Sequence, residues 1–428
     1  QKAILVAGTG ETDCNGVRSP LWKATEHVVR TAYRALIIQG FQPDQIYLLS
    51  PDPVLDADGD GQSDVDAELT ADALRLAITD WTMSPDNPAS ELILYWTGHG
   101  TAGAFDLNCT TSPHQVLTDN TLDGWLDTLQ QSMAGRVISV YDACNSGSFM
   151  AGLSASGDQR RITVTSTLPG EVAWFEDDGR ISFSGSFWST VYGTGRLYAS
   201  FDEARQFLSS DNQDQTPWID KDGDGISDDL EADDFDSDII IGRGRVAASS
   251  PPVIGTVSDP QVLSCQTSAV IQVGDVQAAN HLSSIYAKIL PPQTDTGPTG
   301  VARTDVPSLR LSASDSGPGA VYEGIYRHFD QSGIYTITIY ATDKRGFISR
   351  PRLTRVTRTC GTTPVTGDVD GDSAVDLSDV IIGLRLLTGQ DVSLLLRGDY
   401  ATAGVDAAGN AGLGLEDVLY MLHQISRP

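Results

Sequence analysis

The stretch ELILYWTGHG (residues 91–100) decides how the first half of this chain must fold. A run of apolar and aromatic residues ends at His99, which has a glycine on either side. An unbroken apolar run of this length is typical of a strand buried on both faces, and such strands occur in parallel sheets covered by helices. His99 then follows the carboxyl end of the strand, where such sheets bind their ligands.

Similar buried runs recur on both sides of this stretch. They are AILVAG (3–8), QIYLLS (45–50), RVISVYDA (136–143) and RITVTST (161–167). Segments of helical period lie between or after them, at 20–39, 69–83, 121–133, 186–193 and 201–209. This alternation predicts an α/β domain with a mainly parallel sheet over residues 1–246. The loops GTGETDC, GHGTAG and CNSGSF follow three of the strands and are expected to converge on one site.

The pattern changes after the linker SSPPVIG (249–255). Residues 251–361 alternate apolar and polar positions between Gly, Pro, Asp and Ser, which predicts an antiparallel β-sandwich. A small α-helical module is expected over 366–428, because LSDVIIGLRLLTG (377–389) resembles LEDVLYMLHQI (415–425). The sequence therefore predicts three domains.

Composition excludes some classes of partner. The chain has 28 Lys and Arg against 57 Asp and Glu, a net charge of -29, which disfavours nucleic acids and anionic membranes. No apolar run approaches the roughly 18 to 20 residues that span a bilayer. Because Gln1 is followed almost at once by a strand, we expect that a signal peptide has been removed and that the protein is secreted or displayed on a cell surface.

The five cysteines bear on the same question. Cys14 and Cys109 each lie in a polar loop after a predicted strand, while Cys265 and Cys360 bracket the predicted sandwich. Each pair can close within its own domain, which leaves Cys144 unpaired and favours an oxidising compartment. The alternative is five buried free thiols.

Three segments place Asp at alternate positions, as calcium loops of twelve residues do: 220–231, 368–379 and 56–67. In such loops positions 1, 3, 5, 9 and 12 supply side-chain oxygens and position 7 a backbone carbonyl. The predicted ligands are Asp220, Asp222, Asp224, Ile226, Asp228 and Glu231 in the first loop, Asp368, Asp370, Asp372, Ala374, Asp376 and Asp379 in the second, and Asp56, Asp58, Asp60, Gln62 and Asp64 in the third. The third loop has Ala67 at position 12. Two to three structural Ca²⁺ ions are expected; solvated Asp-Gly turns are the alternative. No organic cofactor is expected, since GTG lacks the third glycine of a dinucleotide loop.

His99 and Cys144 form the candidate catalytic pair. They are 45 residues apart, about one crossover and one strand, so neighbouring parallel strands would present both at one edge. A cysteine nucleophile needs a nearby base or cation, which a histidine provides. The N–H groups of Gly100 and Cys144 could stabilise an acyl oxyanion. The alternatives are a structural histidine and a small buried core cysteine.

These residues also carry a family resemblance. YWTGHG (95–100) followed by VYDACNSGSF (140–149) resembles the His-Gly and Asp/Glu-Ala-Cys-x-Ser-Gly blocks of the caspase-like cysteine peptidases. About the first 245 residues are most similar to bacterial members of the legumain family. The resemblance implies a caspase-like fold, a dyad of His99 and Cys144 and an oxyanion hole of the Gly100 and Cys144 N–H groups.

The resemblance also implies a substrate pocket. Asp142, two residues before the nucleophile, corresponds to the pocket carboxylate, and Asn145 stands where legumains have glutamate after the nucleophile. The family's pocket arginine falls near Ala24 and its pocket aspartate near Ser186. Without that arginine, Asp142 favours Arg or Lys at P1, with Asn as second choice. Trp174 is a candidate wall of the groove, or a packing residue.

The remaining domains resemble an immunoglobulin-like sandwich and a dockerin. A dockerin-like module implies a cohesin-like or cell-surface partner for residues 366–428. The expected function is that of a secreted bacterial, calcium-binding cysteine endopeptidase acting on peptides or proteins. The alternatives are a transpeptidase or ligase that uses the same acyl-enzyme, and a non-catalytic surface-binding protein.

Overall fold

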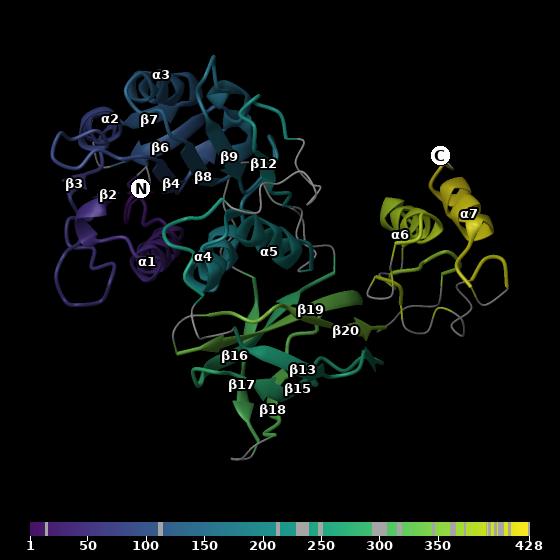
Figure 1. Cartoon of the computed structure of the whole chain (residues 1–428). Helices are drawn as coiled ribbons and strands as arrows, with labels where there is room; N and C mark the ends of the chain where they lie inside the picture. The colour runs from purple at the N-terminus through teal and green to yellow at the C-terminus, as the bar shows by residue number, and fades with distance from the viewer. Residues whose placement is uncertain are drawn as a thin grey trace. The chain divides into compact units, whose positions relative to one another are not determined.

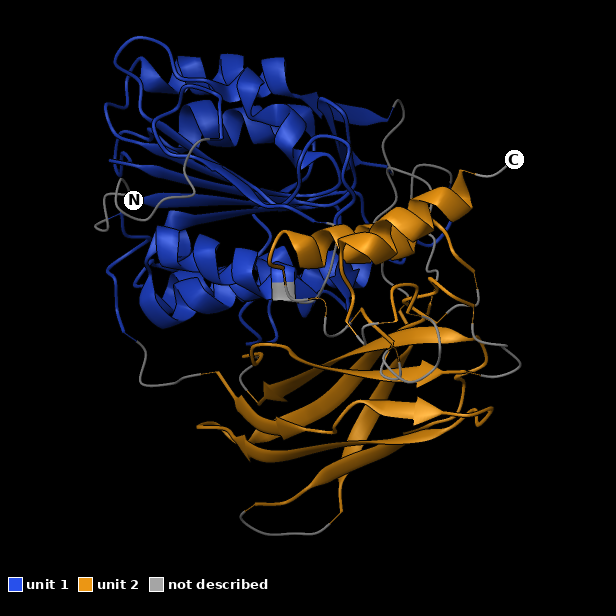
Figure 2. Cartoon of the chain, turned by 90° about the vertical axis from the view of Figure 1, so that its right-hand side faces the viewer, with its two compact units in different colours: residues 1–250, 296–305 blue, residues 251–295, 306–428 orange. Residues whose placement is uncertain are grey.

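A computed structural model gives the fold of this chain. The structure describes residues 1–428 apart from 13–15, 110–113, 211–214, 228–238, 247–250, 293–305, 315–318, 345–346, 360–364, 372–373, 391, 393–394, 398–399, 401–405, 410–411 and 427–428. The described residues fall into two compact units that divide between residues 250 and 251 (Figure 2).

A seven-stranded sheet forms the centre of the first unit. Its order is β12 (Trp218–Asp220), β9 (Arg161–Thr165), β8 (Val137–Asp142), β4 (Leu92–Thr97), β1 (Lys2–Ala7), β2 (Ile46–Ser50) and β3 (Ala67–Glu68). All neighbours pair in parallel except β12 and β9. Every residue of β1, β4 and β8 is buried, so both faces are covered, as the continuous apolar runs predict.

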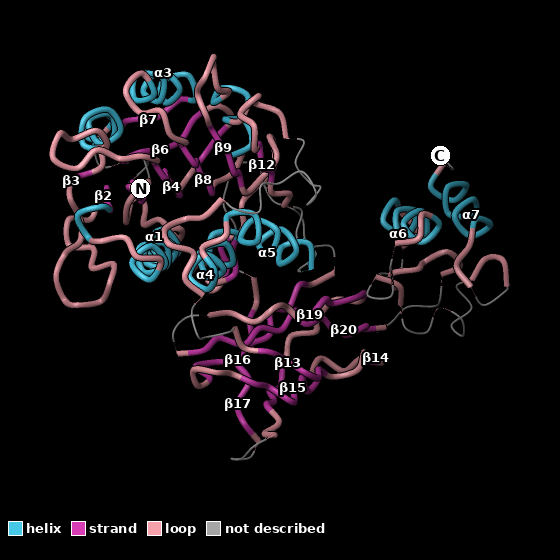
Figure 3. Tube along the Cα trace, viewed as in Figure 1, coloured by secondary structure: helices cyan, strands magenta, loops and turns pink. Residues whose placement is uncertain are grey.

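Helices cover the sheet on two sides (Figures 1 and 3). They are α1 (Trp22–Ile38), α2 (Ala71–Leu76), which continues as one π-helical turn (Ala77–Trp81), α3 (Asp119–Gln130), α4 (Phe183–Thr194) and α5 (Leu197–Ser210). In Figure 1, α2 and α3 lie on one side and α1, α4 and α5 on the other. The five helices and five main strands predicted from the sequence are confirmed, with bounds shifted by a few residues.

Several short elements were not predicted. A three-stranded antiparallel sheet, β5 (Gly100–Thr101), β6 (Ala104–Asn108) and β7 (Gln115–Thr118), follows His99 directly. A two-stranded sheet joins β10 (Phe175–Glu176) to β11 (Ile181–Ser182). Short 3₁₀ helices cover Pro43–Gln45, Ser146–Phe149 and Ala151–Leu153. These elements have too few residues to show a period in the sequence.

The second unit begins with one curled, mostly antiparallel sheet. Its order is β13 (Val253–Val257), β15 (Ala269–Gln277), β18 (Tyr322–Tyr326), β17 (Ser308–Ala313), β16 (Leu282–Leu290), β19 (Gly333–Asp343), β20 (Arg352–Arg358) and β14 (Gln261–Leu263). The expected sandwich of two sheets is joined into one hydrogen-bonded sheet because β17 pairs with β16 at its start and with β18 at its end. Most of its buried apolar residues pack into one core.

The two predicted helices of the last module are confirmed as α6 (Leu377–Leu387) and α7 (Leu415–Ile425), which have a core of their own. Cys144 is a free buried thiol, and Cys109 and Cys265 are disulfide-bonded. Their expected partners, Cys14 and Cys360, lie outside the described residues. Among the residues that the structure describes, no helix is long and apolar enough to span a bilayer.

Candidate functional site at the sheet edge

The pairing of β4 with β8 brings His99 and Cys144 together. These strands are adjacent and parallel, and Thr97 is paired with Asp142 at their carboxyl ends. His99 and Cys144 each come two residues later, so the two residues leave neighbouring strands at the same level. Neighbouring strands lie about 4.8 Å apart. The predicted juxtaposition at one edge of the sheet is therefore what the register produces.

Gly100 lies directly against Cys144. A Cβ atom at this position would lie 2.5 Å from the carbonyl oxygen of Cys144 and 3.0 Å from Cβ of Ala143, so a larger residue does not fit. Asp106 donates its N–H to the carbonyl of His99, which makes these two a hydrogen-bonded pair of the β5–β6 hairpin. The next pair, Gly100 and Phe105, is therefore a non-hydrogen-bonded pair, and the N–H of Gly100 points away from β6.

Cys144 is a buried thiol with a raised pKa. It is 1% exposed, and burial raises its pKa to about 11, assisted by the nearby charge of Asp142. Within the described part of the chain its Sγ takes part in one hydrogen bond, which Ala173 donates from its backbone N–H at 3.3 Å. Such a thiol gains nucleophilicity only as its proton is removed during attack.

The loop over residues 166–174 holds the nucleophile turn. Ser146 donates its N–H to Oγ1 of Thr167 at 2.9 Å, and Thr167 returns a hydrogen bond from its N–H to Oγ of Ser146 at 3.0 Å. Gln215, which is 4% exposed, accepts from the N–H of Trp174 and donates to the carbonyl of Ser166. These contacts join segments 20 to 50 residues apart. They hold the turn that follows Cys144 and the segment whose Ala173 N–H contacts its thiol.

Asp142 is completely buried beside the nucleophile. Ser184, in the first turn of α4, donates its N–H to Oδ2 at 3.0 Å, and Tyr95 donates to the hydroxyl of Ser184 at 2.8 Å. Burial raises the pKa of Asp142 to about 6, opposed by the nearby hydroxyls of Ser184 and Ser166. Among the described residues no basic group opposes this rise. The described surroundings of this carboxyl are therefore apolar groups and hydrogen-bond donors.

The other predicted pocket residues lie in the segments that contact Asp142 and Cys144. Ser186 is 4% exposed in α4, two residues after the Ser184 contact. Trp174 is 6% exposed and follows Ala173, whose N–H reaches the thiol. Asn145 has a φ of 59° and accepts the N–H of Gly170 on Oδ1 at 2.9 Å, so it ties the nucleophile turn to the neighbouring loop.

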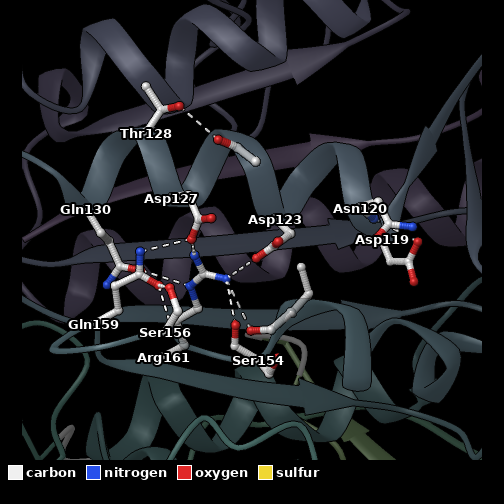
Figure 4. A network of polar contacts seen from close by, with 12 residues as sticks. Asp119, Asn120, Asp123, Asp127, Thr128, Gln130, Ser154, Ser156, Gln159 and Arg161 are labelled. Carbon is white, nitrogen blue, oxygen red and sulfur yellow. Dashed lines mark hydrogen bonds and ion pairs between the residues drawn. The ribbon is translucent and has the colours of Figure 1, made fainter.

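A buried arginine anchors the chain that follows the nucleophile (Figure 4). Arg161 of β9 donates to Asp123 at 2.5 Å and Asp127 at 2.6 Å, both on α3, and to the carbonyls of Leu153 and Ser154 at 3.3 Å. Gln130 accepts from its Nε at 2.9 Å. This network joins α3, β9 and the 3₁₀ turn at 151–153. No sequence pattern predicts this network, because the partners lie 7 to 38 residues from Arg161.

Three acidic clusters lie where the calcium loops were predicted. Each holds three carboxylate oxygens within 4.8 Å of one another, and they comprise Asp56, Asp58 and Asp64; Asp220, Asp222 and Asp224; and Asp368, Asp370 and Asp379. Sets made only of carboxylate oxygens suit hard divalent cations, so a metal ion fits all three. Asp60 and Asp376 belong to none of these clusters; Asp376 instead caps α6. Asp228, Glu231 and Asp372 lie outside the described residues.

The clusters differ in their surroundings. At the start of the loop, Asp56 accepts from the N–H groups of Gly59 and Gly61 in the same way that Asp220 accepts from Gly223 and Gly225. The Asp220 loop also rests on the segment after the nucleophile, because Ala155 donates its N–H to the carbonyl of Gly223 at 2.6 Å. In the third cluster Arg397 contacts Asp368 at 3.1 Å, and both side chains are buried. This guanidinium would compete with an ion there.

Comparisons with known proteins add little to this geometry. No family model and no curated protein matches the sequence. Among solved structures, the fibronectin(III)-like modules of Clostridium thermocellum CbhA share 14% identity over 26% of this chain and 97% of theirs, with a TM-score of 0.17. The PKD domain of an M14-like peptidase from Thermoplasmatales archaeon SCGC AB-540-F20 shares 21% over 26% of this chain and 98% of that chain, with a TM-score of 0.17. The beta-glucosidase from Listeria innocua shares 10% over 84% of this chain and 46% of that chain, with a TM-score of 0.23. Similarities this low carry no argument about function.

Proposed function

We propose that the first unit is a cysteine endopeptidase in which Cys144 is the nucleophile and His99 carries the proton. The observation that supports this most is the register of β4 and β8, which places the two residues at one level of the sheet edge. The fit of Gly100 against the Cys144 carbonyl adds to it. The resemblance to caspase-like peptidases of the legumain family rests on the same residues.

The chemistry follows from the protonated thiol. A peptide carbonyl bound beside Gly100 is attacked by the sulfur of Cys144, a C–S bond forms, and the thiol proton passes to His99. The N–H groups of Gly100 and Cys144 stabilise the oxyanion. His99 then gives the proton to the leaving amine as the C–N bond breaks. Water hydrolyses the thioester and restores the thiol.

Asp142 sets the proposed preference for Arg or Lys at P1. A buried carboxylate without a cation is destabilising, and a basic P1 side chain would neutralise it. Its pocket would be completed by Trp174 and Ser186. Asn at P1 is the second choice, since a protonated Asp142 could donate a hydrogen bond to an amide.

The acidic clusters are proposed to bind Ca²⁺ in a structural role. The ions would be held by Asp56, Asp58 and Asp64, by Asp220, Asp222 and Asp224, and by Asp368, Asp370 and Asp379. An ion there neutralises carboxylates that otherwise repel one another. Calcium together with disulfide bonds also supports the proposal that the protein works outside the reducing cytosol.

Residues 366–428 are proposed to bind a protein partner of the cohesin type, as the dockerin resemblance implies. The supporting observation is a duplicated apolar surface on α6 and α7. Each exposed position of α6 recurs 38 residues later on α7, and the side chains are 38 to 61% exposed: Leu377 and Leu415, Ile381 and Leu419, Leu384 and Leu422, Leu387 and Ile425. Exposed apolar side chains at i, i+4 and i+7 are expected of a helix that docks onto a partner.

The peptidase is tested with a fluorogenic peptide library that varies P1, in calcium, using the wild type, Cys144→Ala and His99→Ala. His114→Ala is the matched control, because His114 lies in the same unit and contacts Asp106. We expect the wild type and His114→Ala to cleave after Arg or Lys. We expect Cys144→Ala and His99→Ala to have lost this cleavage. Cleavage after Asn would reverse the P1 assignment, and capture of an added amine in the product would indicate a transpeptidase. The enzyme proposal is refuted if the wild type cleaves none of the peptides and thiol-reactive peptides do not label Cys144.

A further inference from the structure

The loop after β1 contains a residue in a strained conformation next to His99. Thr9, in the sequence Gly8-Thr9-Gly10, has a φ of 78° and is 2% exposed. This left-handed region is sparsely populated by residues other than glycine, and for a β-branched residue it is an outlier. Such strain is destabilising and persists where the surrounding structure holds it in place.

The backbone of Thr9 is held on both sides by the end of β6. Its N–H donates to the carbonyl of Leu107 at 2.9 Å, and its own carbonyl accepts from the N–H of Cys109 at 3.3 Å. Cys109 is itself disulfide-bonded. A change in the Thr9 backbone would therefore break its hydrogen bonds with Leu107 and Cys109.

The hydroxyl of Thr9 explains why this position holds threonine and not glycine. Glycine would adopt this φ without strain, and glycines stand on both sides of Thr9. Oγ1 of Thr9 accepts the backbone N–H of His99 at 3.3 Å. The two loops also touch through their glycines, since a Cβ atom at Gly98 would lie 3.1 Å from Cα of Gly8. Among the described residues of these two loops, Thr9 is the one whose side chain accepts the His99 N–H.

We propose that Thr9 is a positioning residue for His99, which it holds in register with Cys144 by accepting the His99 N–H. The inference rests on the proposed dyad. This inference gives the GTG loop a role. Its glycines allow close packing, and its threonine supplies the hydroxyl although the backbone there is strained.

The test is the rate at which iodoacetamide alkylates Cys144 in the full-length protein, followed by mass spectrometry across pH. Thr9→Val removes the acceptor at constant shape, Thr9→Ser keeps it, and Thr9→Gly removes both the acceptor and the strain. We expect the valine and glycine variants to be alkylated about three- to tenfold more slowly, which is the worth of one hydrogen bond, and the serine variant to regain most of the rate. Thr82→Val is the matched control, since it removes another buried threonine hydroxyl that bonds a backbone carbonyl.

A double-mutant cycle separates this inference from the proposed function. In a His99→Ala background, Thr9→Val should have no further effect on alkylation. If His99→Ala slows alkylation but Thr9→Val does not, the dyad stands and the role of Thr9 is wrong. If Thr9→Val acts equally in both backgrounds, or Thr9→Gly keeps the wild-type rate, Thr9 does not work through His99. If His99→Ala itself leaves the rate unchanged, the dyad fails and the inference falls with it.

Discussion

Replacing the buried acid beside the nucleophile should stabilise the protein in a manner that depends on pH. Burial raises the pKa of Asp142 from 3.8 to about 6, so the folded protein holds this proton more tightly than the unfolded chain does. Below about pH 4 the group is protonated in both states and costs nothing. As the pH rises from about 4 to about 6, the unfolded chain loses this proton while the folded protein still holds it, so stability falls; above about pH 6 both states are ionised and the full penalty remains.

The size of the effect follows from the same shift. A difference of about 2 pKa units corresponds to about 3 kcal/mol at pH 8, since each unit is 1.36 kcal/mol. Asp142→Asn retains an oxygen that accepts the Ser184 N–H and carries no charge. We therefore expect Asp142→Asn to be more stable than the wild type by about 3 kcal/mol at pH 8 and by nearly nothing at pH 4.

The assay is urea unfolding at pH 4, 6 and 8, with all variants in a Cys144→Ala background to prevent self-cleavage. Asp72→Asn is the control, because the Asp72 side chain is 74% exposed and should show no such pH dependence. A loss of stability in Asp142→Asn that is equal at pH 4 and pH 8 would refute the reasoning. The carboxylate would then be a structural acceptor, and the argument for a basic P1 residue would lose its support.

Three further results are expected. Alkylation of Cys144 should keep rising with pH beyond 9, because burial raises the pKa of the thiol to about 11; a plateau near pH 7 would mean a stable thiolate. Arg161→Met should lower the free energy of unfolding by about 2–4 kcal/mol, less than for a fully buried pair because both carboxylate partners are partly exposed. A decrease under about 1 kcal/mol in urea unfolding would contradict this. EDTA should lower the melting temperature of the wild type more than that of Asp220→Asn, since an ion at a hundredfold excess over its Kd adds about 2.7 kcal/mol; equal shifts would exclude an ion in that loop.

The main elements of the first unit could be predicted because burial on both faces leaves a direct trace in the sequence. ELILYWTG and RVISVYDA have no polar alternation, so their strands are expected to be central, and the spacing of 45 positions from His99 to Cys144 fits one crossover. The register then follows from the parallel pairing of β4 with β8. The acidic clusters could also be predicted from a local pattern, since Asp residues at alternate positions lie in one turn.

The surroundings of the site could not be predicted, because they depend on hydrogen bonds between distant loops. Ala173 reaches Cys144 with a backbone N–H, which any residue other than proline would supply. Thr167 and Gln215 act through contacts that close only when the loops fold over the nucleophile turn. The strand β12, three residues long, brings the Asp220 loop beside β9 and has no recognisable pattern.

Several features that are destabilising by themselves lie close to His99 and Cys144. Thr9 and Asn145 both adopt a positive φ, and each lies next to one member of the pair His99 and Cys144, by hydrogen bond or in sequence. Asp142 is buried there without a cation among the described residues, and the adjacent thiol has a raised pKa. Each of these features is destabilising by itself, and a glycine, an asparagine or an alanine would remove it. A fold that places strain and an uncompensated charge around the same two side chains is better explained by a task at that edge than by packing.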